Sequence, residues 1–164
     1  MSFCFISTPL TINAENKEPN MYPDESLTLS VMCKDNPSCI YSGNRELFIE
    51  IQLTNNALET INFPFEYIKG TGPFITLKDN QTNHELPLRR NLASERLLNE
   101  ITALAPKQSI SFDWVIFDVE LEQFRNQKLI DILAIIHIKT PVYKSNSKEP
   151  ILFNEKATLH IKGN

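Results

Sequence analysis

Hydrophobic and polar residues alternate with a period of two along most of this chain. The clearest runs span residues 26–33, 47–54, 109–116, 129–139 and 157–162, the last within a strand expected over 151–162. This alternation is typical of strands that bury one face and expose the other to solvent. The run at 129–139 is apolar on much of both faces, which predicts a central strand.

Turn residues separate these runs. They cluster at residues 22–25, 55–57, 78–83, 105–108 and 145–150. We expect 61–67 to resume the strand that ends at 54, and 74–77 and 84–88 to form a hairpin. The chain has only four glycines against ten prolines, so asparagine is expected to supply the left-handed turn conformations.

Two stretches depart from the strand pattern. Residues 90–104 carry Leu97 and Ile101 at helical spacing, which predicts a short helix or an irregular crossover. Residues 118–127 offer Asp118 as an N-cap with Glu120 in the first turn, which predicts one or two turns of helix.

About seven to nine short strands with frequent turns predict an all-β fold, an immunoglobulin-like antiparallel β-sandwich with one or two short helices in the crossovers. A length of 164 residues fits one domain over the whole chain. Within it, residues 1–25 are expected to form an N-terminal segment and first strand, and 26–162 the main sandwich.

A sequence resemblance points to the same fold. Residues 46–56, which end a strand in Thr-Asn-Asn, and residues 104–111, which turn through Ala-Pro-Lys-Gln, resemble bacterial immunoglobulin-like domains. In those domains a Pro-Gly-type turn precedes the later strand, whereas Lys107 stands here in place of glycine. The resemblance covers roughly residues 46–162 and implies a fold, not a function.

Composition and charge exclude several classes of protein. Hydrophobic residues make up 41% and charged residues 22%, as in a globular protein. A net charge of −4 leaves no cationic surplus for a phosphate backbone, so no nucleic-acid partner is expected. No apolar run reaches the roughly 18 residues of a membrane span. Cys4 near the start is a candidate lipid-attachment site, but Phe3 before it suits that processing poorly, which favours a half-buried thiol.

Cys33 and Cys39 lie on either side of an Asn-Pro turn. The intervening residues can fold back far enough to bring the two Cα atoms within disulfide reach. We predict a disulfide, with two unrelated thiols as the alternative. A disulfide would favour an oxidising compartment, so we expect a periplasmic or extracellular location, with the cytoplasm as the alternative.

Candidate catalytic and metal-binding groups are sparse, and we predict no enzyme activity, cofactor or metal. His137 and His160 could approach each other on paired strands, but Asp131 would lie too far from His137 to complete a metal site. Glu120 and Glu122 could pair as carboxylates, although a solvated acidic edge is the plainer interpretation. No glycine-framed nucleophile or phosphate loop is present in the sequence.

Two surfaces are candidates for protein binding. The first is the aromatic and glycine-containing segment 63–74, with these candidate residues: Tyr67, Lys69, Thr71, Pro73 and Phe74. Its alternative is a strand that packs its aromatic side chains into the core. The second is the acidic set Asp118, Glu120 and Glu122, opposite Arg89, Arg90 and Arg96. Its alternative is a set of solvated or mutually paired charges. Phe48, on the wet face of its strand, is expected to be covered by the 90–104 crossover.

The leading hypothesis is a non-catalytic, extracytoplasmic protein-binding domain, specifically a bacterial inhibitor or immunity protein that blocks a partner toxin or enzyme. A structural or adhesive envelope subunit is the first alternative, and a small hydrolase is the second. An adhesive subunit should show an unpaired edge strand. A hydrolase should show a pocket that holds His137 or His160 with an acid and a nucleophile.

Overall fold

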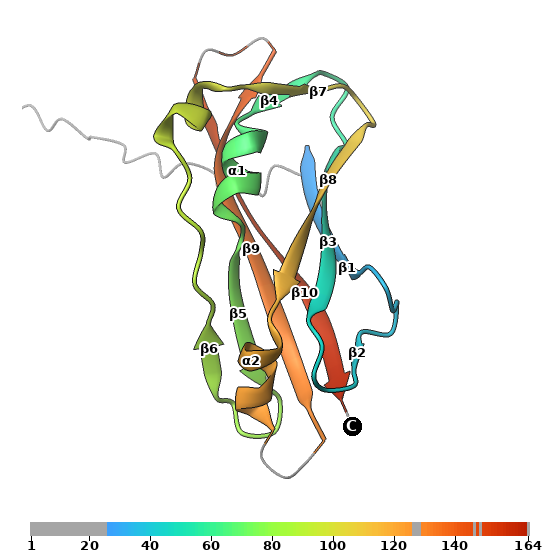
Figure 1. Ribbon diagram of the computed structural model, residues 1–164. Coiled ribbons are helices and arrows are strands. Elements are labelled where there is room, and N and C mark those ends of the chain that lie inside the picture. The colour runs from blue at the N-terminus through green and yellow to red at the C-terminus, as the bar shows by residue number, and fades with distance from the viewer. Residues whose placement is uncertain (1–25, 126–128, 146, 148, 164) are drawn as a thin grey trace, which may run out of the picture.

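The computed structural model describes residues 26–125, 129–145, 147 and 149–163, which form two β-sheets packed face to face (Figure 1). The smaller sheet is antiparallel with the order β1–β3–β8. Its strands are β1 (Leu27–Cys33), β3 (Leu47–Asn55) and β8 (Ser109–Ile116). The predicted Cys4 site lies outside the described residues.

The larger sheet is built around β9 (Asp131–Lys144), which pairs with β10 (Ile151–Gly163) along one edge. Its other edge pairs with β5 (Phe74–Asp79) and then with β4 (Ile61–Phe63). The sheet is completed by β2 (Ile40–Tyr41), β6 (Glu85–Pro87) and β7 (Thr102–Leu104). The expectation that 129–139 forms a central strand is confirmed.

The prediction of an all-β, immunoglobulin-like sandwich is confirmed, with two differences in detail. The described residues contain ten strands, because strands of two or three residues such as β2 and β7 are too short to show a periodic pattern. In addition, β2 runs parallel to β10, pairing Ile40 with Lys162, so the larger sheet is not wholly antiparallel.

The expected strand at 61–67 is wrong beyond Phe63, because the chain turns there into a helix, α1 (Phe65–Thr71). Pro64 has no N–H to give to a sheet ladder, while its carbonyl accepts a hydrogen bond from Ile68 N–H in the first helical turn. The helix lies between the ends of the two sheets (Figure 1), and it buries Phe65 and Ile68.

The other two helical segments are short, as predicted. Residues 90–104 contain one 3₁₀ turn, η1 (Glu95–Asn99), in an irregular crossover that ends in strand β7. The later segment contains α2 (Asp118–Leu121) followed by η2 (Glu122–Phe124). Its N-cap is Phe117 rather than Asp118, and the Phe117 N–H donates to Glu120 Oε2 at 2.9 Å.

The core fills the space between the sheets with the inward-facing residues of each strand. Ile49, Ile51 and Leu53 of β3 are fully buried, as the period-two pattern predicts. One buried polar group closes the end of β3: Asn55 Nδ2 donates to the carbonyls of Glu59 and Leu104 at 2.9 and 2.8 Å. This asparagine therefore ties the loop after β3 to β7 without leaving an unpaired amide.

Candidate protein-binding surfaces

The first candidate surface lies where α1 joins β5, and it is more buried than the sequence suggests. Thr71 and Pro73 are buried and Tyr67 is half-buried, while Lys69 and Phe74 are exposed. The turn between helix and strand depends on Gly72, which has a φ of 72°. A Cβ atom at this position would lie 2.1 Å from the Trp114 ring, so the indole packs directly against this glycine.

Arg90 closes this junction from the outside. Its guanidinium lies 3.9 Å from the centre of the Phe74 ring, and its Nη2 donates to Thr71 Oγ1 at 2.7 Å. Its Nε also donates to the carbonyl of Gly72 at 3.0 Å. Thr71 and Arg90 are therefore engaged within the chain, which leaves Lys69 and Phe74 as the members of this candidate set that a partner could reach.

The acidic candidate residues are all engaged within the chain. The hydroxyl of Tyr41 contacts the carboxylates of both Asp118 and Glu122, the latter at 2.6 Å. Burial and the two carboxylates raise the pKa of Tyr41 well above its usual range. Glu122 also pairs with Arg125 at 3.2 Å, and Glu120 accepts from Phe117 N–H. In these contacts Glu122 has a cation as partner, Arg125, while Asp118 and Glu120 accept hydrogen bonds from neutral groups.

The histidines do not approach each other. His137 lies opposite Lys156 and His160 lies opposite Leu133, so four residues separate the two along each strand. His160 Nε2 instead contacts Asp131 Oδ1 at 2.5 Å, a contact that the sequence analysis, which placed Asp131 far from His137, did not predict. Hydrogen bonds from Asn80 and then from His160 hold the pKa of Asp131 below its usual value.

The features expected of a metal centre or a hydrolase site do not come together in the described part of the chain. No group of three or more potential metal ligands occurs within it. His137 lines a cavity of only about 20 Å³, and no serine or cysteine lines that cavity. The hydrolase alternative therefore gains no support from the structure.

The disulfide between Cys33 and Cys39 is confirmed. The two Cα atoms lie 5.4 Å apart, and both residues are 3% exposed. Beside this loop is a groove of about 240 Å³, lined in part by Ile40 and Phe48. Phe48 is 39% exposed and borders this groove, so the expectation that residues 90–104 cover it is wrong.

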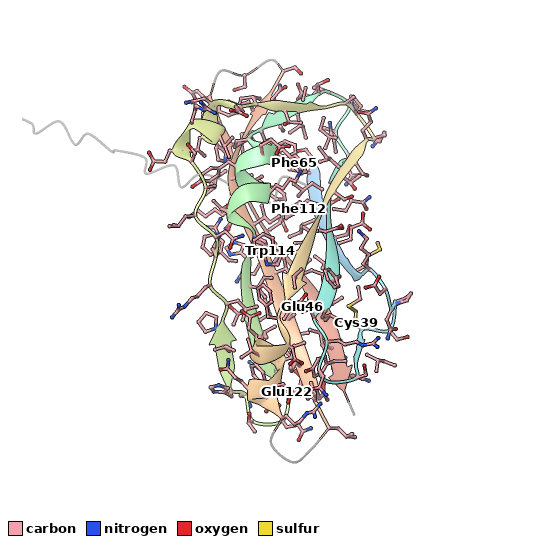
Figure 2. The ribbon with its side chains drawn as sticks, in the orientation of Figure 1. Cys39, Glu46, Phe65, Phe112, Trp114 and Glu122 are labelled. Atoms are coloured by element: carbon pink, nitrogen blue, oxygen red, sulfur yellow. A yellow bond between two sulfur atoms is a disulfide. The ribbon has the colours of Figure 1, made fainter. Side chains whose placement is uncertain are left out.

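A third surface, which the sequence reasoning missed, follows the edge of β8. A groove of about 220 Å³ lies between β8 and residues 88–91. Apolar side chains contribute much of its lining: Leu88, Trp114, Val115 and Phe117. Phe117 is 51% exposed, and Trp114 lies between the sheets below Phe112 in Figure 2. Only the lack of lysine and proline in 109–116 could have hinted at this surface.

No protein-family model and no curated protein matches this sequence. Among solved structures, the chain is similar to the putative ApaA protein of Bordetella pertussis, with 11% identity over 82% of this chain and 93% of the other, at a TM-score of 0.43. It is also similar to PapD-like domain 7 of human CEP192, with 9% identity over 100% and 95% of the two chains, at a TM-score of 0.39.

A β-glucosidase of Listeria innocua shares 12% identity over 95% of this chain and 20% of its own, at a TM-score of 0.35. With such low identities and scores, these likenesses concern the fold alone. The resemblance to bacterial immunoglobulin-like domains likewise extends to the fold and no further. No helix among the described residues is long and apolar enough to cross a membrane.

Proposed function

We propose that this chain is a non-catalytic, extracytoplasmic protein-binding domain that inhibits a partner toxin or enzyme in the manner of an immunity protein. The observation that carries the proposal is the open groove beside β8, where exposed Phe117 and part-buried Trp114 lie together. Aromatic side chains in a recess are the usual anchors of protein interfaces.

Two further features support this function. The disulfide between Cys33 and Cys39 is of a kind that persists in oxidising compartments, which favours an extracytoplasmic location. The net charge of −4 favours rapid capture of a basic protein partner through long-range attraction. Neither feature depends on the groove, so they support the proposal independently.

The test is capture of the partner followed by an activity assay. The biotinylated chain is incubated with the periplasmic and secreted proteins of the source organism, and retained proteins are quantified by mass spectrometry. We expect one protein in stoichiometric amount, and we expect the purified chain to inhibit its activity at a 1:1 ratio.

Two variants locate the contact. Phe117→Asp places a charge in the groove and should abolish retention, whereas Leu58→Asp changes an exposed leucine outside the groove lining and should not. Recovery of no stoichiometric partner would contradict the proposed function. Equal retention by the Phe117→Asp variant would remove the groove as its site.

One observation favours the second candidate function, a structural or adhesive envelope subunit. Among the described residues, one edge of β8 has no neighbouring strand, which is the feature expected of a subunit that accepts a strand from its neighbour. The same capture experiment separates the two functions. An assembly subunit should retain copies of a structural protein in extended polymers, without inhibiting any toxin or enzyme.

A further inference from the structure

Within the part of the chain that the structure describes, the outer edge of β8 presents a row of backbone groups that no neighbouring strand pairs with. In the described residues β8 pairs with β3 alone, and the Asn55 N–H donates to the carbonyl of Gln108 just before the strand. Because backbone groups of successive residues point to opposite edges, the even-numbered residues of β8 face β3. Ser111, Asp113 and Val115 therefore direct their N–H and C=O groups away from the sheet.

This edge lacks the features that usually prevent strand addition. Edge strands are commonly shortened or carry lysine or proline. The edge strands β6 and β7 have three residues each, and β6 ends at Pro87. In contrast, β8 has eight residues and contains neither lysine nor proline. It is therefore long enough to pair with an incoming segment over its whole length.

On its inner side, this edge borders a groove that is suited to the apolar side chains of an added strand. The groove between β8 and residues 88–91 is open beside Trp114 and Leu88. A strand added to β8 would direct every second side chain into this groove, because side chains alternate between the faces of a sheet. These positions should hold residues such as valine, which pack well on a pleated surface.

The outer face beside the same edge carries an excess of negative charge. Asp113 lies directly opposite Glu50 on β3, and like charges at such positions repel each other. Lys34 contacts Asp113, so this row has one cation for two carboxylates. A basic side chain on an added strand, placed next to Asp113, would neutralise the remaining charge.

We propose that β8 is a docking edge to which a partner protein adds an extended segment of alternating apolar and basic residues. The apolar side chains enter the groove beside Trp114, and the basic side chains lie next to Asp113 on the outer face. The proposal rests on the proposed protein-binding function and specifies the chemistry of the bound segment. It predicts that the backbone of β8 makes the contact.

The probe is a synthetic peptide of alternating valine and lysine, as long as β8, titrated into the ¹⁵N-labelled full chain. We expect the amide signals of Ser111, Asp113 and Val115 to shift and to gain protection from hydrogen exchange. A peptide of alternating valine and glutamate is the charge-reversed control. It should bind at least about fivefold more weakly, because it places carboxylates beside Asp113.

A matched pair of variants tests whether the backbone is responsible. Ser111→Pro removes an outward N–H and blocks the approach of a strand, while the bonds of β8 to β3 are kept. Ser111→Ala also loses the hydroxyl that donates to Glu50 but keeps the N–H. We expect Ser111→Pro to weaken peptide binding at least about fivefold and Ser111→Ala to leave it within about twofold.

Circular dichroism would establish that both variants are folded. The proposal is overturned if the valine–lysine peptide does not bind at millimolar concentration, or if the shifted amides lie elsewhere. Equal binding by the Ser111→Pro and Ser111→Ala variants would also overturn it. So would a dimer of the chain that Ser111→Pro dissociates, because β8 would then be occupied by a second copy.

The results can distinguish a failure of the proposed docking edge from a failure of the proposed function. If a natural partner is captured but the β8 amides remain unaffected in the complex, the protein-binding function stands and the docking edge does not. If the peptide binds at β8 but no partner is captured, the edge stands and the proposed inhibitor function does not.

Discussion

At the residue scale, the contact between Gly72 and Trp114 fixes how the two sheets meet. Gly72 has a left-handed φ of 72°, and any Cβ there would meet the indole at 2.1 Å. We expect Gly72→Ala to lower the free energy of unfolding by about 2–4 kcal/mol, from backbone strain and overpacking together. Gly70→Ala in α1 is the matched control: its Cβ would lie 3.1 Å from the Cβ of Ala93, a milder contact at an ordinary helical φ, so stability should change by less than about 1 kcal/mol. Urea denaturation of both variants checks this prediction, and equal losses would contradict it.

Asp79 makes the stability of the chain depend on pH. Its carboxylate accepts from Thr82 Oγ1 at 2.6 Å and from Gln81 N–H at 2.8 Å, and these bonds lower its pKa in the folded state. A lowered folded pKa adds stability above the unfolded value of about 4, and this stability is lost as the pH falls. We therefore expect Asp79→Asn to destabilise the chain at pH 7 by about 1 kcal/mol.

The difference between wild type and Asp79→Asn should narrow as the pH falls from 5 toward about 2, because wild-type Asp79 then becomes protonated. Denaturation at a series of pH values measures this directly. Asp35→Asn, in the exposed loop after β1, is the control. A gap that stays constant with pH would show that Asp79 acts through shape rather than charge.

At the scale of elements, the disulfide fixes the path from β1 to β2. It closes a small loop, and the chain-entropy relation gives a stabilisation of about 2 kcal/mol. The double variant Cys33→Ser/Cys39→Ser should be less stable by this amount and insensitive to reductant, and reduced wild type should match it. Thiol titration of unfolded, unreduced wild type should count one free thiol from the three cysteines. A count of three would exclude the disulfide.

The elements that could be predicted from sequence are those in which apolar and polar residues alternate within the element itself. The long strands β3 and β9 were predictable over 47–54 and 129–139, where apolar residues recur at every second position, whereas the continuation of β9 to Lys144 was not predicted. The helix α1 could not be told from a strand by its pattern, because Phe63, Phe65 and Tyr67 continue the strand alternation; Pro64 is the residue at which that strand ends. The edge of β8 could not be read from sequence, because which strands lack a neighbour depends on the order of strands in the sheet.

The same distinction explains the candidate surfaces. Residue types alone predicted a contact surface in 63–74. They did not predict that Arg90, 16 residues beyond Phe74, contacts both Thr71 and Phe74. The contact of Tyr41 with Asp118 joins residues 77 apart. Such contacts depend on the tertiary arrangement of the chain, and no local pattern encodes them.

At the scale of the whole molecule, the expectation of one domain, with its main sandwich over 26–162, can be tested with a single probe. Trp114 is the only tryptophan of the chain, and it lies on β8 of the smaller sheet against Gly72, just before β5 of the larger one. Its fluorescence therefore reports the packing of one sheet on the other, whereas far-ultraviolet circular dichroism reports the strands of both. If the two sheets form one cooperative unit, both signals should change at the same urea concentration.

Gly72→Ala should move both midpoints together to lower urea, since it disturbs the contact that joins the sheets. Because each sheet alone would leave its inward-facing apolar residues in water, neither sheet is expected to persist once the other unfolds. A fluorescence transition that precedes the loss of circular dichroism would contradict a single domain. It would show instead that the larger sheet keeps its strands after the smaller one has separated from it.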